Sequence, residues 1–474
     1  MFRTITASLA ACAFTFALTI SPAVKAQEAE LLSTMGIGEL IALGSAFGIP
    51  PGLVNPSFEV SAYRVTYDMP FLDSIVSVSG ALFTPLSMDL ACGAPTMTYM
   101  HGTMFVREDA PSFLGSEGQL GFLMASLGFV TLMPDYVGLG TSDLLHPYIH
   151  AQSEADAGVY FLEAASVLSE ELGYTMGSEN FVMGYSQGGH AAMAMAREMQ
   201  TNWNDEFPLT AAAPMSGPYD LSGTQFPLGF AQESYSNPAY MAYTALAWQS
   251  IYGNLYNDLS DWFVEPYASE LPGMFDGITS GGEINDYLPT LTADVIQPGL
   301  LESLLEDGSP FLAAAQDNDV YEWVPESPIQ MYYCTMDEQV FYDNALVAET
   351  HMNDAGAPSI TTINGGPLTH GGCALVAILG GTLWSAGQAD FCSLVGVDEQ
   401  GAGLALNAFP NPTSGDVRIE GLAVGAKWTL LDASGRTIFG GVAEASLLDM
   451  KTGQLASGLY TFVQGAGAVR IAVQ

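Results

Sequence analysis

Short apolar runs typical of buried strands alternate with longer stretches in which apolar residues recur at helical spacing. The strand candidates span 96–100, 128–133, 209–215, 329–334 and 359–363, and the helix candidates span 151–172, 187–199 and 340–353, with a last helix from about residue 373. Strands that alternate with helices form a mostly parallel sheet, whose ligand site lies at the carboxyl ends of the strands. The pattern therefore predicts an α/β protein with a mostly parallel sheet flanked by helices.

Two earlier stretches, 59–67 and 75–83, alternate apolar with polar residues and are rich in residues that favour strands. The turn between them contains Pro70 and Asp73. This arrangement is typical of an antiparallel hairpin.

The alternation stops after Gly217 and Pro218 and resumes only at the strand candidate 329–334. The intervening stretch, about 219–327, is rich in tyrosine, tryptophan and phenylalanine. We interpret it as a helical cap inserted over the ligand site. Aromatic residues at helical spacing form protein cores more often than they contact substrates, so no specificity residue is assigned within it.

The last part of the chain differs in pattern and in charge. Short strand candidates separated by turn residues indicate a small β-sandwich over 403–474. Residues 28–400 contain only three basic residues, all arginine, whereas beyond residue 400 five basic residues match five acidic ones. This shift predicts a domain boundary near residue 400, with the main domain over 27–400.

Residues 1–26 have the features of a secretory signal peptide. Arg3 precedes an apolar run over 7–20 that is too short to span a bilayer, and Val24-Lys25-Ala26 offers a cleavage site before Gln27. No later apolar run approaches the length of a transmembrane helix. We therefore expect a secreted or cell-surface protein that has no transmembrane segment.

The formal net charge of -41 excludes two classes of partner. Nucleic acids and anionic membranes bind through clustered positive charge, which residues 28–400 lack. We interpret the acidic surface as a solvated face that keeps the protein soluble in a salty medium.

Four cysteines remain once Cys12 has left with the signal peptide, namely Cys92, Cys334, Cys373 and Cys392. In an exported protein this number suggests two disulfides, and three connectivities are open. Cys373 and Cys392 are the pair closest in sequence.

The candidate nucleophile is Ser186, in the pattern Gly184-Tyr185-Ser186-Gln187-Gly188. In a nucleophile elbow of this kind, a strained backbone exposes the serine hydroxyl. A β-carbon on Gly184 or Gly188 would collide with the neighbouring strand or helix. Three fixed positions occur often by chance, but here a strand candidate precedes the turn and a helix candidate follows it, as the elbow requires.

A serine hydroxyl becomes a good nucleophile when an imidazole takes its proton and an acid orients the imidazole. We assign the base to His370, which follows the last strand candidate on a glycine-rich loop. We assign the acid to Asp337, which stands a few residues after the strand candidate 329–334. Capping of the following helix is the alternative role of Asp337, and the two roles are compatible.

The rival residues are less well placed in the sequence. Glu338 is adjacent to Asp337 but is expected to point elsewhere, and Asp343 falls inside the next helix candidate. The other histidines precede the elbow, lie within helix candidates or flank a turn: His101, His146, His150, His190 and His351.

The oxyanion of a tetrahedral intermediate needs two backbone N–H donors. We expect one from Gln187, at the N-terminus of the elbow helix, and the other from Thr103, in the loop after the strand candidate 96–100. Gly102 is the alternative to Thr103. A plain tight turn at His101-Gly102 is the interpretation without a catalytic role.

No cofactor and no catalytic metal are expected. His146 and His150 have a spacing that suits a metal, but Pro147 between them argues against a regular helix and no third ligand is evident. Asp317-Asn318-Asp319 lacks the glycine and the distal glutamate of a calcium loop. Asp135 is expected to anchor its own loop through hydrogen bonds.

Together, these motifs resemble the α/β-hydrolase superfamily from about Glu59 to Cys392. The segments that look like its secretory lipase and esterase branch are His101-Gly102-Thr103, Asp135-Tyr136-Val137-Gly138-Leu139-Gly140, His146-Pro147-Tyr148, the Ser186 elbow, Asp337 and His370. This resemblance implies an exported serine hydrolase that cleaves small-molecule or lipid esters. A serine peptidase of the same fold, with an acidic cap that grips a peptide amino terminus, and an inactive surface binding protein are the alternatives.

Separately, residues 403–474 resemble the C-terminal sorting domain of the type IX secretion system of Bacteroidetes. The resemblance rests on Pro410-Asn411-Pro412, Asp432-Ala433-Ser434-Gly435-Arg436 and Ser457-Gly458-Leu459-Tyr460. It implies export across the outer membrane by the type IX secretion machinery. Cleavage of the domain during release or surface anchoring is compatible with it.

Overall fold

The computed structural model describes residues 26–391, apart from 51–52, 54 and 87–92, and residues 406–473, apart from 412, 414, 433–436, 454, 457 and 465–466. The chain divides into two compact units, Met1–Cys392 and Ser393–Gln474. Several predictions lie outside the described residues: the signal peptide up to residue 25, any disulfide of Cys92 or Cys392, and parts of the sorting-domain motifs at Pro412, 433–436 and Ser457.

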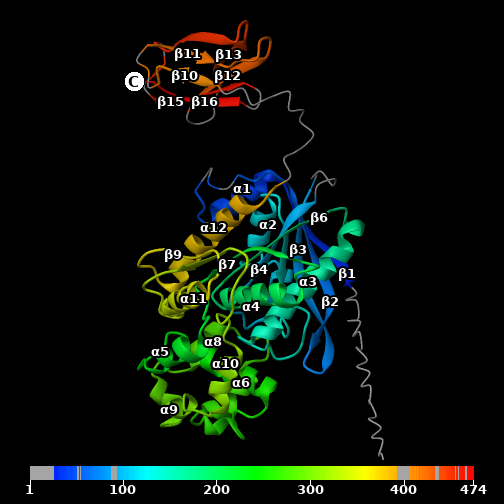
Figure 1. The fold of residues 1–474 in the computed structure, drawn as a ribbon, viewed down its shortest axis with the longest axis vertical. Coiled ribbons are helices and arrows are strands. Elements are labelled where there is room, and N and C mark those ends of the chain that lie inside the picture. Colours follow the sequence, from blue (N-terminus) through cyan, green and yellow to red (C-terminus); the bar gives the residue numbers. More distant parts are fainter. Residues whose placement is uncertain are drawn as a thin grey trace, which may run out of the picture. The chain divides into compact units, whose positions relative to one another are not determined.

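A nine-stranded sheet forms the centre of the first unit, in the order β1-β2-β3-β5-β4-β6-β7-β8-β9 (Figure 1). Antiparallel pairing joins β1 (Ala26–Met35), β2 (Val60–Phe71), β3 (Ser74–Pro85) and β5 (Val130–Pro134). The remaining strands run parallel to β5: β4 (Ala94–Met100), β6 (Met176–Tyr185), β7 (Leu209–Met215), β8 (Ile329–Tyr333) and β9 (Ile360–Asn364). The predicted mostly parallel sheet is confirmed.

The predicted hairpin is formed by β2 and β3, whose last pair joins Phe71 to Ser74. Its loop therefore contains only Leu72 and Asp73, and Leu72 adopts a φ of 51°. Such short hairpin loops need positive φ because only this backbone matches the twist of the two strands. Pro70 lies within β2 and not in the loop.

Helices cover both faces of the sheet (Figure 1). One face packs against α3 (Ala151–Leu172), α4 (Gln187–Asn202) and α11 (Asp343–Asp354). The other packs against α1 (Ile37–Ala46), α2 (Leu120–Ala125) and α12 (His370–Gln388). Strands buried on both faces are mostly apolar, and all seven residues of β4 are buried, including Thr96 and Thr98. This is why the central strands were visible as largely apolar runs.

Phe161 of α3 packs where Gly80 of β3 leaves room for it. The Phe161 ring is fully buried and stacks on Tyr67, with ring centroids 5.0 Å apart. A β-carbon on Gly80 would lie 2.4 Å from that ring. The three residues therefore form one packing unit that holds α3 on the sheet.

The segment between β7 and β8 forms the predicted helical cap, which is green to yellow-green at the lower end of the first unit in Figure 1. Its helices are α5 (Phe226–Phe230), α6 (Ala239–Tyr252), α7 (Tyr267–Met274), α8 (Gly281–Tyr287), α9 (Leu300–Leu304) and α10 (Pro310–Asp317), preceded by a π-helical turn at Leu221–Gln225. Most of its aromatic residues pack in a separate core around Trp248 and Phe311. As expected, these aromatics serve the packing of the cap.

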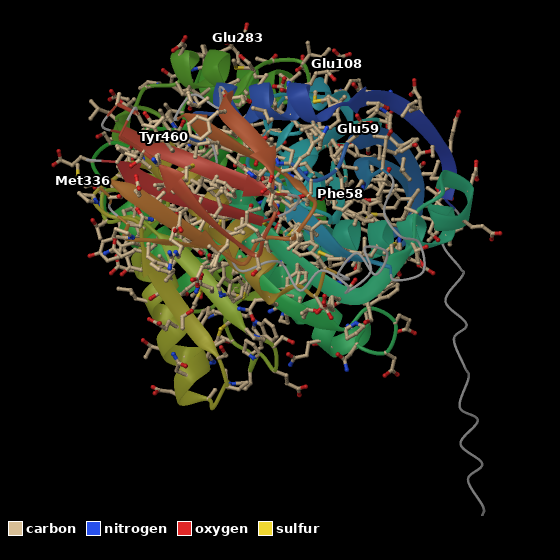
Figure 2. All side chains as sticks on the ribbon, turned by 90° about the horizontal axis from the view of Figure 1, so that it is seen from above. Phe58, Glu59, Glu108, Glu283, Met336 and Tyr460 are labelled. Carbon is tan, nitrogen blue, oxygen red and sulfur yellow. A yellow bond between two sulfur atoms is a disulfide. The ribbon has the colours of Figure 1, made fainter. Side chains whose placement is uncertain are left out.

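Acidic side chains lie at the surface of the first unit. Glu108 and Glu283 are exposed and project outward in Figure 2. Because the chain has 51 acidic and only 10 basic residues, most carboxylates have no cationic partner. Water must therefore stabilise these charges. Within the part of the chain that the structure describes, no helix is long and apolar enough to cross a membrane.

The second unit contains two antiparallel sheets, as the predicted β-sandwich requires. One has the order β10-β11-β14 and the other β13-β12-β15-β16. The strands are β10 (Asn407–Phe409), β11 (Asp416–Glu420), β12 (Lys427–Asp432), β13 (Thr437–Val442), β14 (Leu447–Lys451), β15 (Gly458–Gln464) and β16 (Gly467–Val473). Ile419 from the first sheet and Leu430 and Phe462 from the second are fully buried in one core.

We expect Phe161→Ala to lower the free energy of unfolding by about 3–5 kcal/mol, because it empties the space beside Gly80 and removes the ring stacked on Tyr67. Denaturant unfolding followed by fluorescence measures this change. Val167→Ala is the matched control, since Val167 lies on the same helix and is 60% exposed. Equal stability of the two variants would contradict the packing role of Phe161.

Candidate active site

Ser186 lies in a strained turn between β6 and α4. Its backbone has φ 62° and ψ -122°, a conformation that L-residues rarely adopt. A β-carbon on Gly184 would lie 2.2 Å from the carbonyl oxygen of Gly188, and one on Gly188 would lie 1.9 Å from that of Met100. Backbone atoms cannot move aside for a side chain here, so the predicted need for glycine at both positions is confirmed.

The structure brings Ser186, His370 and Asp337 together. The Nε2 atom of His370 lies 2.9 Å from Ser186 Oγ, and its Nδ1 atom lies 2.7 Å from Asp337 Oδ2. An ionised carboxylate only accepts hydrogen bonds, so Nδ1 carries the hydrogen and Nε2 is free to accept from the serine hydroxyl. Asp337 and His370 are both buried. The arrangement can therefore pass a proton from Ser186 to His370 and stabilise the resulting imidazolium.

Asp337 also stabilises the backbone turn that follows it. Its Oδ1 atom accepts hydrogen bonds from the backbone N–H groups of Gln339 and Val340, at 3.0 and 2.9 Å. Asp337 thus caps the turn after β8, while α11 begins only at Asp343, three residues later than predicted. As expected, Asp337 both caps a backbone segment and contacts His370, although the capped segment is a turn and not the helix.

His370 is the first residue of α12, and the predicted loop position and helix start near residue 373 are wrong. Thr369 caps the helix through a hydrogen bond from the N–H of Gly372 to its hydroxyl. The glycines after His370 suggested a loop, whereas the N-cap preference of threonine was the better signal. The Tyr185 hydroxyl donates to the His370 carbonyl at 2.6 Å, which further fixes the backbone of His370.

Glu338 contacts the backbone of His370, while the ring nitrogens of His370 face Asp337 and Ser186. The Oε2 atom of Glu338 accepts a hydrogen bond from the His370 N–H at 3.1 Å. Partial burial acts to raise the pKa of Glu338, but this bond and others to the carboxylate lower it overall. A carboxylate is favourable there because the first N–H groups of a helix have no partner within the helix.

A disulfide joins Cys334 to Cys373, with Cα atoms 6.0 Å apart. Pairing of Cys373 with Cys392 is therefore wrong. Proximity in the sequence was misleading because β8 and the start of α12 meet at the same edge of the sheet. Cys334 lies three residues before Asp337 and Cys373 three residues after His370, so the crosslink brackets the acid and the base.

The candidate oxyanion donors are distinguished by which N–H groups are free. The N–H of Gly102 donates to Glu117 Oε1 at 3.0 Å and is therefore taken. Among the described residues, no acceptor faces the N–H of Thr103 or that of Gln187. This favours Thr103 over Gly102. Burial raises the pKa of Glu117, a residue that the sequence analysis did not single out.

The other histidines have structural partners. His101 and His146 contact backbone carbonyls through Nδ1, and His150 caps α3 by accepting from the Ser153 N–H. Burial lowers the pKa of His146 to about 3 and that of His150 to about 4, so both are neutral near pH 7. No cluster of three or more potential metal ligands occurs within the described residues.

Asp135 anchors its loop, as expected. It accepts from the Ser79 hydroxyl at 2.5 Å and from the Ser112 N–H at 2.9 Å. These bonds connect the loop after β5 to β3 and to the segment that precedes α2.

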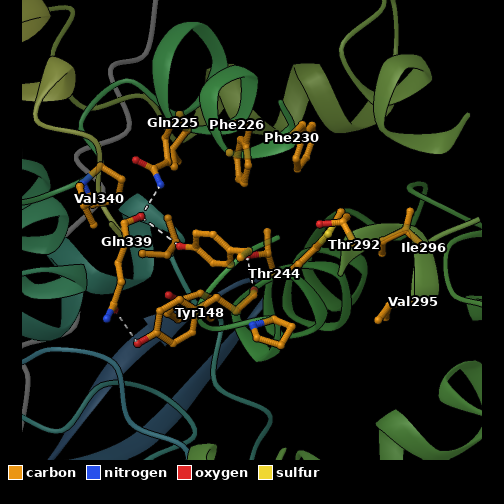
Figure 3. Close-up of a pocket in the computed structure, with 18 of the residues that line it drawn as sticks. Tyr148, Gln225, Phe226, Phe230, Thr244, Thr292, Val295, Ile296, Gln339 and Val340 are labelled. Carbon is orange, nitrogen blue, oxygen red and sulfur yellow. Dashed lines mark hydrogen bonds between the residues drawn. The ribbon is translucent and has the colours of Figure 1, made fainter. Parts of the chain in front are cut away.

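A pocket lies between Ser186 and the cap (Figure 3). Phe226 and Phe230 project into it from above, opposite Tyr148. The other apolar side chains on its wall include Leu221, Met241, Phe263, Val295 and Ile296. None of the described residues that line it is charged. The pocket is therefore suited to a neutral, apolar group.

At one end of this pocket, the cap is tied to the turn that carries Asp337. The Gln339 carbonyl accepts from the Gln225 side chain at 2.9 Å and from the Tyr235 hydroxyl at 3.0 Å. The first of these contacts is drawn in Figure 3. Gln339 also donates to Asp337 through its backbone N–H. The position of the acid is thus connected to the packing of the cap.

Esterases and lipases are among the solved structures similar to this chain. The rice cell wall degrading esterase LipA from Xanthomonas oryzae is 25% identical, with a TM-score of 0.67 over 76% of this chain and 96% of LipA. A putative hydrolase from Legionella pneumophila is 24% identical, with a TM-score of 0.69 over 77% of this chain and 98% of its own. Lipase A from Candida antarctica in its closed state is 14% identical, with a TM-score of 0.58 over 77% of this chain and 81% of its own.

Comparison with protein-family models and with curated proteins gave no match. The likeness to solved structures nevertheless establishes an α/β-hydrolase fold with an inserted cap. The similarity to the LipA esterase supports an ester hydrolase of that fold.

We expect Cys334→Ala combined with Cys373→Ala to lower the free energy of unfolding, because the crosslink no longer restricts the unfolded chain. The expected loss is about 4 kcal/mol for a sequence separation of 39 residues. Guanidinium unfolding of the double variant and of the oxidised parent measures it. An unchanged unfolding midpoint and slope would contradict this contribution.

Proposed function

We propose that the chain is an exported serine hydrolase that cleaves carboxylic esters, with Ser186 as nucleophile, His370 as general base and Asp337 as orienting acid. One observation carries this proposal. An unbroken series of hydrogen bonds, of 2.7 and 2.9 Å, runs from Asp337 through His370 to a serine in a strained elbow.

The reaction follows from these contacts. Ser186 Oγ attacks the ester carbonyl carbon while His370 Nε2 takes its proton, and Asp337 stabilises the imidazolium. His370 then donates that proton to the leaving alcohol oxygen as the bond from carbon to that oxygen breaks. A water molecule, deprotonated by His370, hydrolyses the acyl-enzyme in the same manner and releases the acid.

The oxyanion that forms in each step is held by the backbone N–H groups of Gln187 and Thr103. Gln187 supports this assignment because it is the first residue of α4, where N–H groups lack intrahelical partners and the helix dipole favours negative charge. Thr103 supports it because the neighbouring N–H of Gly102 is already bound to Glu117.

The pocket favours an ester with an apolar acyl or alcohol group. Its uncharged, largely aromatic and aliphatic wall would gain stabilisation from burial of hydrocarbon and would penalise a charged group. A peptidase that grips a peptide amino terminus needs a carboxylate at that place, and the described residues of the pocket wall supply none. This observation favours the esterase over the peptidase.

We further propose that the second unit is a type IX sorting domain that brings the enzyme to the cell surface or releases it. The sequence motifs and a β-sandwich with its own apolar core support this proposal. The disulfide beside the active site fits an oxidising extracellular environment.

We expect Ser186→Ala to reduce kcat for p-nitrophenyl butyrate by about 10⁴-fold or more, since loss of a triad nucleophile leaves only oxyanion stabilisation and binding. Circular dichroism should show an unchanged fold. Ser166→Ala, on the exposed surface of α3, is the control and should retain full activity. Full activity of Ser186→Ala would exclude the elbow assignment, and failure of the parent to react with a fluorophosphonate would favour the inactive binding protein.

We expect Phe230→Asp to lower kcat/KM for p-nitrophenyl octanoate by at least about tenfold relative to p-nitrophenyl acetate, because a carboxylate in the pocket opposes burial of a long chain. Leu228→Asp is the matched control, as Leu228 lies on the same short helix, is 37% exposed and does not line the pocket. If both variants keep the parental preference, the acyl chain does not occupy this pocket.

Parallel assays with aminoacyl amides test the peptidase, which a preference for amides would favour.

A further inference from the structure

Beneath the nucleophile elbow lies a cluster of buried polar side chains that the reaction above does not use. Glu154 and His190 are in contact at 2.7 Å, and both side chains are 0% exposed. The Gln187 side chain, also buried, contacts Glu154 and His146. The cluster adjoins Ser186 through the peptide bond to Gln187.

The hydrogen atoms of the pair between Glu154 and His190 can be assigned from its partners. His190 Nε2 lies 2.9 Å from the carbonyl oxygen of Asn318, which can only accept, so Nε2 carries a hydrogen. One further proton lies between His190 Nδ1 and Glu154 Oε2. Whichever atom holds it, the pair is neutral overall and both side chains have one hydrogen-bonded orientation.

The Gln187 amide is held by two acceptors. Its Nε2 atom lies 2.8 Å from Glu154 Oε1 and 2.8 Å from His146 Nε2. Burial lowers the pKa of His146 to about 3, and its Nδ1–H donates to the Val137 carbonyl, so Nε2 is an acceptor. The Gln187 amide oxygen has no partner among the described residues. A flipped amide would place this oxygen against two acceptors, and the observed orientation is therefore enforced.

Two segments contact the Gln187 side chain directly, through Glu154 and His146, and others contact it through Glu154 and His190. Glu154 lies in the first turn of α3, His190 in the first turn of α4 and His146 in the loop after β5. Asn318 ends the cap helix α10, and its side chain also accepts from the N–H of Ala151 at the start of α3. The side chain of Gln187 is thus fixed relative to the two helices and the loop that surround the elbow.

We propose that Glu154, held by His190, is a positioning residue that aims the backbone N–H of Gln187 at the developing oxyanion. This inference rests on the proposed function, in which that N–H is one of the two oxyanion donors. The cluster reaches the reacting atoms only through Gln187 and takes no part in proton transfer.

The energetics of buried charge favour this role over a purely stabilising one. A buried ion pair is commonly no more stabilising than apolar residues of the same volume, because both groups lose their hydration. Its benefit is a defined geometry, since each partner must keep its hydrogen bonds. An oxyanion donor needs a fixed position, because a displacement of about 1 Å near the reacting atoms can lower the rate about 10²-fold.

The test compares Glu154→Ala, Glu154→Gln, Gln187→Ala and the double variant Glu154→Ala/Gln187→Ala. Each is measured for kcat and KM on p-nitrophenyl butyrate, for the inhibition constant of an alkyl boronic acid and for the rate of labelling by a fluorophosphonate. The boronic acid forms a tetrahedral adduct with a serine and so reports the oxyanion site separately from substrate binding. Asn180→Ala is the control, because Asn180 is also buried and hydrogen-bonded but lies in the middle of β6, six residues before Ser186.

We expect Glu154→Ala and Gln187→Ala to lower kcat by about 10²-fold, with KM changed less than about threefold. The inhibition constant of the boronic acid should rise, and the labelling rate fall, in parallel with kcat. Glu154→Gln should restore activity to within about threefold of the parent, because its amide can accept from Gln187 and donate to a neutral His190. The double variant should be no slower than either single variant, as residues that act through one contact are not additive.

Unchanged kcat in Glu154→Ala or Gln187→Ala would overturn the inference, as would additive losses in the double variant or a folded Glu154→Gln that is as slow as Glu154→Ala. If Glu154→Ala does not fold, Gln187→Ala and Glu154→Gln decide by the same criteria. A parent that neither turns over esters nor reacts with the fluorophosphonate would refute the proposed function itself. That outcome differs from an active parent whose variants keep their rates, which refutes the positioning role alone.

Discussion

The close approach of three backbone segments at Met100, Gly184 and Gly188 is the constraint on which the active site depends. The carbonyl oxygens of Met100 and Gly188 occupy the positions where side chains at the two glycines would begin. This contact presses the first turn of α4 against the ends of β4 and β6. Ser186 has no room for an ordinary backbone conformation there and adopts its positive φ. The exposed hydroxyl is thus a product of main-chain packing.

The site is assembled from two halves, whose strands belong to one sheet. The nucleophile half is built on β4, β6 and α4. The half with the acid and the base is built on β8 and α12, where the capped turn at Asp337, the contact of Glu338 and the disulfide of Cys334 act together. Two contacts described here join the halves: the bond between Ser186 and His370, and the Tyr185 hydroxyl on the His370 carbonyl. Small shifts between the halves would therefore change the reactivity of Ser186.

The three central residues could be predicted from the sequence because their positions follow from chain order. Ser186 ends one strand, Asp337 follows another and His370 follows a third, and parallel strands bring their carboxyl ends to one edge. The strand candidates were visible because strands buried on both faces are mostly apolar, and the helix candidates because apolar residues recur at helical spacing. These features depend on local pattern and topology, which a single sequence contains.

The supporting residues could not be found in this way. The contacts of Glu117 with Gly102 and of Glu154 with Gln187 connect residues 15 and 33 positions apart, and 51 acidic residues offered no reason to select these two. The disulfide partner of Cys373 depended on which elements meet at the sheet edge. The predicted start of α12 was three residues too late, because the two glycines after His370 suggested a loop although Thr369 is a favourable N-cap residue. Such details require the packed structure, since they arise from side chains that meet across the fold.

Because basic residues are unevenly distributed, the two units also differ in the lysine amino groups that they offer to chemical reagents. Residues 28–400 contain no lysine, while Lys427 and Lys451 are exposed on the second unit. Reagents that acylate lysine side chains would therefore modify the β-sandwich and would find no lysine between residues 28 and 400. A surface that captures the protein through these two side chains would hold it by the β-sandwich and leave the residues around Ser186 free of covalent attachment.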